Sequence, residues 1–339
     1  MRTEKDLPWL AEPLRQLRDG QRGHALILQG GIGAGLLELA LRLAQAWLCE
    51  QPPGPCDQCA GCHLVLAHTH PDLKVLMPES WQQRLQWSGE DEGGAAEDGS
   101  KSKKKPSREI KVEAVRQAID WSHTSNARGQ AKVLVLFPAD AMNAVSANAL
   151  LKTLEEPAPG MKVLLAVEDP EHLLPTLRSR CQRSRLAPPD ETSALAWLGQ
   201  QGLAQPHALL RAAGGQPLGA LELASQGLSG EAWAGLPRQL AQGDWAMLAS
   251  WPLPQALHTL QCLCHDLMAR SCGGTPRYFP VEALPAVADW AALSEWSREL
   301  QRVRRHEDHP WQAGLVLESL AQQLLPLLRK RASRAGAAA

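Results

Sequence analysis

A short apolar run followed by a cluster of glycines is the feature that most restricts how this chain can fold. The run His24–Gln29 carries Ala-Leu-Ile-Leu at its centre, as a strand buried on both faces does. Gly30–Gly35 is then a turn or loop, and apolar residues recur every three or four positions from Leu36 to Trp47, which predicts a helix. A strand, a glycine loop and a helix in this order open an α/β nucleotide-binding unit.

Two further apolar runs extend this unit. Ala131–Phe137 and Lys162–Val167 predict central strands, because Val and Leu occupy consecutive positions in both. Between them lies Ser146–Glu156, a segment of good helix formers that Pro157 terminates. Strands that alternate with helices predict a mainly parallel sheet, so we expect an α/β module here.

The glycine loop lacks the side chains that bind and activate ATP. The phosphate-loop pattern is G-x-x-x-x-G-K-[ST], and Gly30, Gly33 and Gly35 supply its glycines. Leu36 and Leu37 stand where the lysine and the hydroxyl residue belong. The lysine neutralises phosphate charge and the hydroxyl binds Mg²⁺, so we expect no bound nucleotide and no ATP hydrolysis. Backbone amides alone can cradle a phosphate, but a glycine turn leading into a packed helix is favoured.

The end of the next strand also departs from the ATPase pattern. Phe137–Pro138 occupies the place where acidic side chains would hold Mg²⁺, and Asp140 follows three residues after Phe137. We interpret Asp140 as a helix cap near Met142 rather than as a catalytic carboxylate. The sequence therefore indicates the fold of an ATPase without its catalytic groups.

A cluster of cysteines follows the first helix of this unit. Four of the eight cysteines fall within fourteen residues, namely Cys49, Cys56, Cys59 and Cys62. Four thiolates can enclose zinc in a tetrahedron, so the spacing predicts a structural site with no open position for catalysis. Buried cysteines without metal and a redox CxxC pair are the alternatives, and both explain four clustered cysteines less well. We expect the nearby histidines to be surface or packing residues; they are His63, His68 and His70.

Composition limits the remaining possibilities. The 339 residues include 35 Lys+Arg and 36 Asp+Glu, and the formal charge of −1 excludes a uniformly basic nucleic-acid binder. At about 100–200 residues per domain, the length predicts two or three domains. No apolar run approaches the ~18 residues of a membrane span, and no secretory signal is recognisable, so a cytoplasmic protein is expected. Residues 88–107 contain no large apolar side chain, and we predict a disordered insertion there.

Three motifs resemble those of bacterial clamp-loader subunits, which are AAA+ proteins of DNA polymerase III. They are the helix Ala147–Pro157, the Ser-Arg-Cys sequence within Thr176–Cys181, and the segment Thr69–Asp72. The four-cysteine insertion is also typical of this family. Its tau/gamma motor subunits keep the phosphate-loop lysine, and they carry a nucleotide-sensing threonine where this chain has Val167–Glu168. The chain therefore resembles the family's non-catalytic stator subunit.

The resemblance implies three domains within a hetero-oligomer. An AAA+ α/β module would span residues 1–187 and carry the zinc insertion 49–62, and a small helical lid would span 188–228. An all-α collar domain would occupy 229–339. By this resemblance the partners are the delta and tau/gamma subunits of an open ring, which places the sliding clamp on primer–template DNA during replication.

The resemblance also gives the Ser-Arg-Cys motif a role. Arg180 corresponds to an arginine finger that acts in trans on ATP in a neighbouring subunit, Ser179 would support the motif, and Cys181 would pack. No ATPase or polymerase activity is expected of the isolated chain, which would be one component of a DNA-directed DNA polymerase holoenzyme. The alternatives are an active tau/gamma-like ATPase, which Leu36 and Leu37 argue against, and a zinc-ribbon nucleic-acid-binding protein, which leaves the α/β module unexplained.

Overall fold

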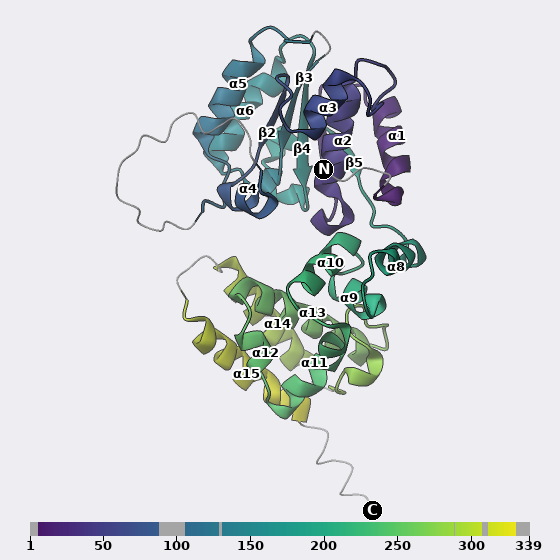
Figure 1. Ribbon diagram of the computed structural model, residues 1–339. Helices are drawn as coiled ribbons and strands as arrows, with labels where there is room; N and C mark the ends of the chain where they lie inside the picture. Colours follow the sequence, from purple (N-terminus) through teal and green to yellow (C-terminus); the bar gives the residue numbers. More distant parts are fainter. Residues whose placement is uncertain (1–5, 88–105, 129–130, 288, 307–310, 330–339) are drawn as a thin grey trace, which may run out of the picture. The chain divides into compact units, whose positions relative to one another are not determined.

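The computed structural model describes residues 6–87, 106–128, 131–287, 289–306 and 311–329 (Figure 1). The chain divides into two compact units, Met1–Pro189 and Asp190–Ala339. The insertion predicted to be disordered, 88–107, lies outside the described residues except for its last two positions. None of the helices in the described ranges is both long enough and apolar enough to cross a membrane.

The first unit is built on a parallel sheet whose described strands follow the order β2-β3-β4-β1-β5. The strands are β1 (Ala25–Gln29), β2 (Leu73–Leu76), β3 (Lys132–Leu136), β4 (Met161–Val167) and β5 (Gln182–Arg185). This confirms the predicted parallel sheet. The three strands expected from apolar runs, β1, β3 and β4, lie together at its centre.

The two outer strands, β2 and β5, do not follow from apolar patterns. β5 reads Gln-Arg-Ser-Arg and is exposed or half-buried along its whole length, whereas β3 is buried at every position. The backbone pairs β5 with β1 in a register that sets Ile27 opposite Arg183. An edge strand has one neighbour only, so backbone pairing suffices to place it.

Helices cover both faces of this sheet (Figure 1). One face carries α1 (Ala11–Gly20) and α2 (Leu36–Leu48), and the other carries α5 (Val112–Ser122) and α6 (Ala144–Glu155). On the second face, Val115, Leu150 and Leu165 belong to one continuous apolar core. The shorter elements are α3 (Ala60–Leu66), α4 (Glu79–Leu85), α7 (Pro175–Arg178) and the 3₁₀ turns η1 (Pro8–Leu10), η2 (Ile32–Ala34), η3 (Ala139–Ala141) and η4 (Pro170–His172).

Helix α6 begins earlier than the sequence pattern suggests, and its cap is a different residue. The side-chain oxygen of Asn143 accepts a hydrogen bond from the Ser146 N–H at 3.0 Å, as an N-cap does. The prediction that Asp140 caps this helix is wrong, because Asp140 lies in the separate turn η3. Asn143 stands directly before the first helical residue, whereas Asp140 is three positions too early to reach the free N–H groups.

Among the described residues, the regular elements of the second unit are all helices. Its elements are α8 (Glu191–Gln200), α9 (Pro206–Ala212), α10 (Pro217–Ser225), α11 (Gly230–Gln242), α12 (Ala246–Ala249), α13 (Leu253–Ser271), η5 (Val281–Ala283), α14 (Trp290–Arg305) and α15 (Ala313–Arg329). The carboxylate of Asp266 on α13 is fully buried and accepts three backbone hydrogen bonds of 2.8 Å from Arg277–Phe279. This contact holds the chain that follows α13 against the helix.

Candidate functional site

The four predicted metal ligands come together at the C-terminal end of α2 and the start of α3. All four sulfur atoms lie within 4.8 Å of one another, and none is in a disulfide. The distances from Cys49 to Cys59 and from Cys56 to Cys62 are 4.0 and 3.8 Å between sulfur atoms. A tetrahedral zinc site with Zn–S bonds of ~2.3 Å separates its sulfurs by about 3.8 Å, so the cluster fits a metal such as zinc.

Backbone amides of the loop point at these sulfur atoms. The N–H groups of Gln58 and Cys59 donate to the Cys56 sulfur at 3.5 and 3.3 Å, and they lower the pKa of that thiol to about 6. The Cys62 N–H donates to the Cys59 sulfur at 3.3 Å, whereas burial raises the pKa of the Cys62 thiol to about 12. Amides directed at sulfur stabilise thiolates, the form that binds metal.

A buried arginine ties the cysteine loop to α2. Arg42 has 1% of its surface exposed, and its guanidinium donates to the Asp57 carboxylate at 2.5 Å. The Gln45 side-chain amide completes the connection by donating to the Cys62 carbonyl oxygen at 3.2 Å. Sequence reasoning missed these residues. The available signal was a charged side chain, Arg42, between two leucines of a strongly apolar helix.

The three nearby histidines are not part of the sulfur cluster. A ring nitrogen of His63 contacts the Asp57 carbonyl oxygen, His68 stacks on Trp87 with ring centroids 3.8 Å apart, and the His70 Nδ1 accepts from the Asp72 N–H. Burial lowers the pKa of both His68 and His70. The Thr69–Asp72 motif ends in Asp72. Its buried carboxylate accepts hydrogen bonds from the backbone N–H groups of residues 127 and 128 and so holds the loop that contains them.

The degenerate phosphate loop is packed from both sides. Gly35 adopts a φ of +97° as the cap of α2, and a Cβ there would lie 3.2 Å from the Leu10 side chain. Gly30 is confined more tightly, because a Cβ would lie 2.9 Å from the Cβ of Leu186. Leu36 is fully buried and Leu37 is 6% exposed. The two leucines are therefore core residues of α2.

A carboxylate occupies the loop where a nucleotide phosphate would bind. The backbone N–H of Ile32 donates to the side chain of Glu168 at 3.1 Å. Asp140 lies nearby, and burial together with the Glu168 charge raises the pKa of its carboxyl group. Negative charge at this point repels phosphate, which adds to the effect of the missing lysine.

The Ser-Arg-Cys motif follows α7 on the face of the sheet that α6 covers. The Arg180 side chain is 34% exposed and forms an ion pair with Glu155, the last residue of α6. Its Nη1 group donates to the Thr176 carbonyl oxygen at 2.8 Å and to the Ser179 hydroxyl at 3.3 Å. Cys181 packs against the apolar core, and burial raises its thiol pKa to about 11. Glu155 is a contact that sequence reasoning missed, since 25 residues separate it from Arg180.

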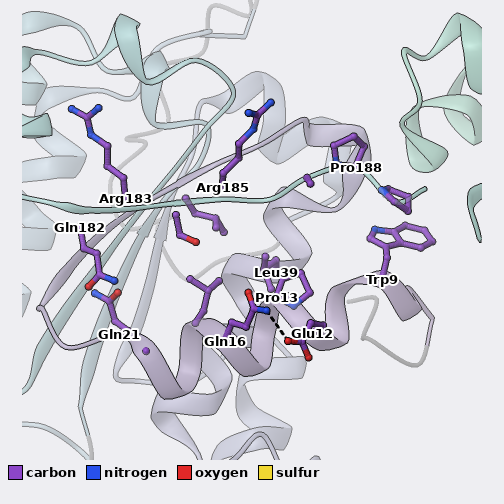
Figure 2. Close-up of a pocket in the computed structure, with 16 residues that line it drawn as sticks. Trp9, Glu12, Pro13, Gln16, Gln21, Leu39, Gln182, Arg183, Arg185 and Pro188 are labelled. Carbon is purple, nitrogen blue, oxygen red and sulfur yellow. Dashed lines mark hydrogen bonds between the residues drawn. The ribbon is translucent and has the colours of Figure 1, made fainter. Parts of the chain in front are cut away.

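A cavity of about 430 Å³ lies between α1 and β5 (Figure 2). The side chain of Gln182 points toward α1, whereas those of Arg183 and Arg185 point to the other side of the strand. The Glu12 carboxylate in this cavity already accepts hydrogen bonds from Gln16 and Arg15. The lining combines the Glu12 carboxylate and the Gln16 and Gln182 amides with apolar side chains such as Leu39.

Comparison with known proteins identifies the family. The family model described as "DNA polymerase III, delta subunit" matches residues 10–190. DNA polymerase III subunit delta' of Escherichia coli is 35% identical over 283 residues, which cover 78% of this chain and 77% of that protein. The chain belongs to the delta' family of DNA polymerase III subunits. The delta' subunit of Pseudomonas aeruginosa is 36% identical over 65% of this chain and 62% of its own length.

Among solved structures, the delta'-family chain is similar to a DNA polymerase III gamma subunit-related protein of Thermotoga maritima. The TM-score is 0.47 at 16% identity, over 94% of this chain and 99% of that one. The match to the family model, over residues 10–190, covers all five strands of the parallel sheet, the cysteine cluster and the Ser-Arg-Cys motif. It confirms the clamp-loader resemblance and the AAA+ fold.

Proposed function

We propose that this chain is the non-catalytic stator subunit of a DNA polymerase III clamp loader, which helps to load the sliding clamp onto primed DNA. The observation that carries this proposal is the state of the phosphate loop. Leu36 is buried where a lysine would contact phosphate, and the Glu168 carboxylate accepts the Ile32 N–H. We expect a loop without the lysine and the hydroxyl residue not to turn over ATP, so we propose that the subunit contributes to the ring in another way.

The proposed assembly follows from the family. Delta and tau/gamma subunits are the proposed neighbours, and the sliding clamp and primer–template DNA are reached through the complex. We propose that the chain works in the cytoplasm. Residues 1–187 would form the AAA+ module, 188–228 a helical lid and 229–339 a collar for oligomerisation. The helical character of residues 191–329 supports the last two assignments, as far as these residues are described.

The proposed chemical contribution is Arg180, acting in trans as an arginine finger. Its guanidinium is partly exposed at the end of α7, with the Ser179 hydroxyl bound beside it. A permanently charged planar fork suits the stabilisation of charge that develops on a transferred phosphoryl group. In GTPases such a residue contributes about 10³–10⁵ in rate. Ser179 would hold the motif in place.

The proposed metal is a structural Zn²⁺ held by the four cysteines. Four sulfur ligands satisfy zinc fully and leave no position for a substrate or an activated water. When bound, the ion would cross-link the end of α2 to α3. A zinc-ribbon nucleic-acid-binding function is less favoured, since Arg42 and Gln45 tie the cysteine loop to the helix of an α/β module.

The second candidate is an active tau/gamma-like ATPase, and one reconstitution separates it from the stator. A clamp loader is assembled with this chain or its Arg180→Ala variant, and DNA-stimulated ATP hydrolysis and clamp loading are measured. For the stator, the variant assembles normally but hydrolysis slows at least tenfold. Unchanged hydrolysis and loading would remove the finger assignment, and ATP turnover by the isolated chain would favour the motor. Arg183→Ala, which removes an exposed arginine from the following strand β5, is the matched control.

A further inference from the structure

We propose that the ion pair with Glu155 keeps the Arg180 guanidinium from contacting nucleotide, which we call parking of the finger. Nucleotide bound to the neighbouring subunit then competes with the Glu155 carboxylate for this guanidinium. This inference rests on the proposed role of Arg180 as a finger. Glu155 is thereby a positioning residue that sets how readily the finger engages. It acts through Arg180 and contacts no reacting atom.

The contacts of Arg180 leave little of its guanidinium free. Nε donates to Oε1 of Glu155 at 2.7 Å, and Nη2 pairs with the same oxygen. Nη1 donates to the Thr176 carbonyl oxygen and to the Ser179 hydroxyl. An arginine has five N–H donors, so these contacts engage four and leave a single Nη2 hydrogen.

This occupancy matters because arginine recognises phosphate through two parallel N–H bonds. The Nε/Nη2 edge is taken by Glu155, and the Nη1/Nη2 edge is half taken because Nη1 already donates to Thr176 and Ser179. Two-point contact with a phosphate therefore requires one of these partners to leave. Glu155 is the partner that can exchange, since it comes from another element and ends a flexible side chain.

The surroundings of Glu155 favour pairing until a stronger anion arrives. Glu155 is the last residue of α6, where the helix dipole disfavours a carboxylate, and the neighbouring Glu156 adds a like charge. The Arg180 cation offsets both. The pair remains accessible, with 49% of the Glu155 side chain exposed, so solvent can replace the guanidinium when it moves.

The experiment compares Glu155→Gln with Glu156→Gln in the reconstituted loader. Both variants remove one carboxylate from the same exposed surface, but Glu156 has no ion pair among the described residues. ATP hydrolysis is measured against ATP concentration at saturating clamp and DNA. Glu155→Gln is expected to lower the ATP concentration for half-maximal rate about two- to fivefold without lowering the maximal rate, because an exposed pair shifts a competing equilibrium by that much. Glu156→Gln is expected to match the wild type.

The Arg180→Ala background distinguishes failure of this inference from failure of the finger role. In that background Glu155→Gln should have no further effect, because the competing cation is gone. If Arg180→Ala itself changes nothing, the proposed function fails. If Arg180→Ala slows hydrolysis, the finger role stands. Parking is then refuted if Glu155→Gln raises the ATP concentration for half-maximal rate, lowers the maximal rate, or behaves like Glu156→Gln. Circular dichroism and assembly of the loader verify that each variant folds.

Discussion

The backbone N–H of Ile32 donates to the Glu168 carboxylate at 3.1 Å, across the mouth of a loop whose sequence resembles a phosphate-binding loop. Ile32 belongs to the glycine-rich turn η2 and Glu168 directly follows β4, so this bond links the loop to the centre of the sheet. An acceptor of this chain stands where a phosphate oxygen would accept. The loop thus keeps its backbone shape, but one of its N–H donors is already bonded to a carboxylate of the same chain.

The first prediction concerns nucleotide binding by the isolated chain. We expect no saturable binding of MgATP by the wild type, measured by calorimetric titration up to millimolar ATP. Glu168→Ala frees the Ile32 N–H but adds neither the missing cation nor the hydroxyl for Mg²⁺, so we expect no saturable binding there either. Saturable, Mg²⁺-dependent binding by the wild type would contradict the stator assignment, and Glu168→Gln is the matched control for side-chain volume.

The second prediction concerns the buried ion pair that anchors the cysteine loop. Arg42→Met keeps most of the aliphatic stem but leaves Asp57 without this partner, which should lower the free energy of unfolding by about 2–4 kcal/mol. Chemical denaturation of the zinc-loaded protein measures this change. We also expect faster metal transfer to a chelator, since the loop is held less firmly. Arg15→Met, which removes an exposed pair with Glu12, should change stability by less than about 1 kcal/mol.

Local patterns predicted the buried core of the first unit, because each central strand carries its own apolar run. They did not predict β5, whose Gln-Arg-Ser-Arg sequence is placed by backbone pairing with β1 alone. The cysteine cluster was predictable because its ligands lie close in sequence. The partners of Arg42 and Arg180 were not, since Asp57 and Glu155 reach them only after folding.

The third prediction concerns the pH dependence of stability through Asp140. Burial raises the pKa of this carboxyl in the folded protein above its value in the unfolded chain. The folded state therefore binds the proton more tightly than the unfolded chain does. The contribution of this proton to the free energy of unfolding is complete below the pKa of Asp140 in the unfolded chain, and it is lost as pH rises through the pKa in the folded protein. Asp140→Asn keeps the neutral form at every pH. We expect this variant to be more stable than the wild type at pH 7–8, with a difference that shrinks on acidification.

Denaturation curves from pH 4 to pH 8 measure that difference. Asp120→Asn, which removes an exposed carboxylate at the end of α5, controls for the change in net charge. A stability difference for Asp140→Asn that grows on acidification would contradict the assignment, because it would require the ionised form to be the one favoured by folding.

The fourth prediction concerns the metal. Protein purified without chelator should contain about one zinc ion per chain, as elemental analysis would show, because four sulfur atoms within 4.8 Å complete a tetrahedral site. Cys62→Ser should lose most of this zinc and lower Tm by about 5 °C or more, since the ion stabilises the loop that joins α2 to α3. Cys272→Ser, an exposed cysteine of the second unit, should keep the zinc content and Tm of the wild type. Absence of zinc from carefully purified wild-type protein would rule out the structural zinc site, and equal zinc in both variants would show that the metal is bound elsewhere.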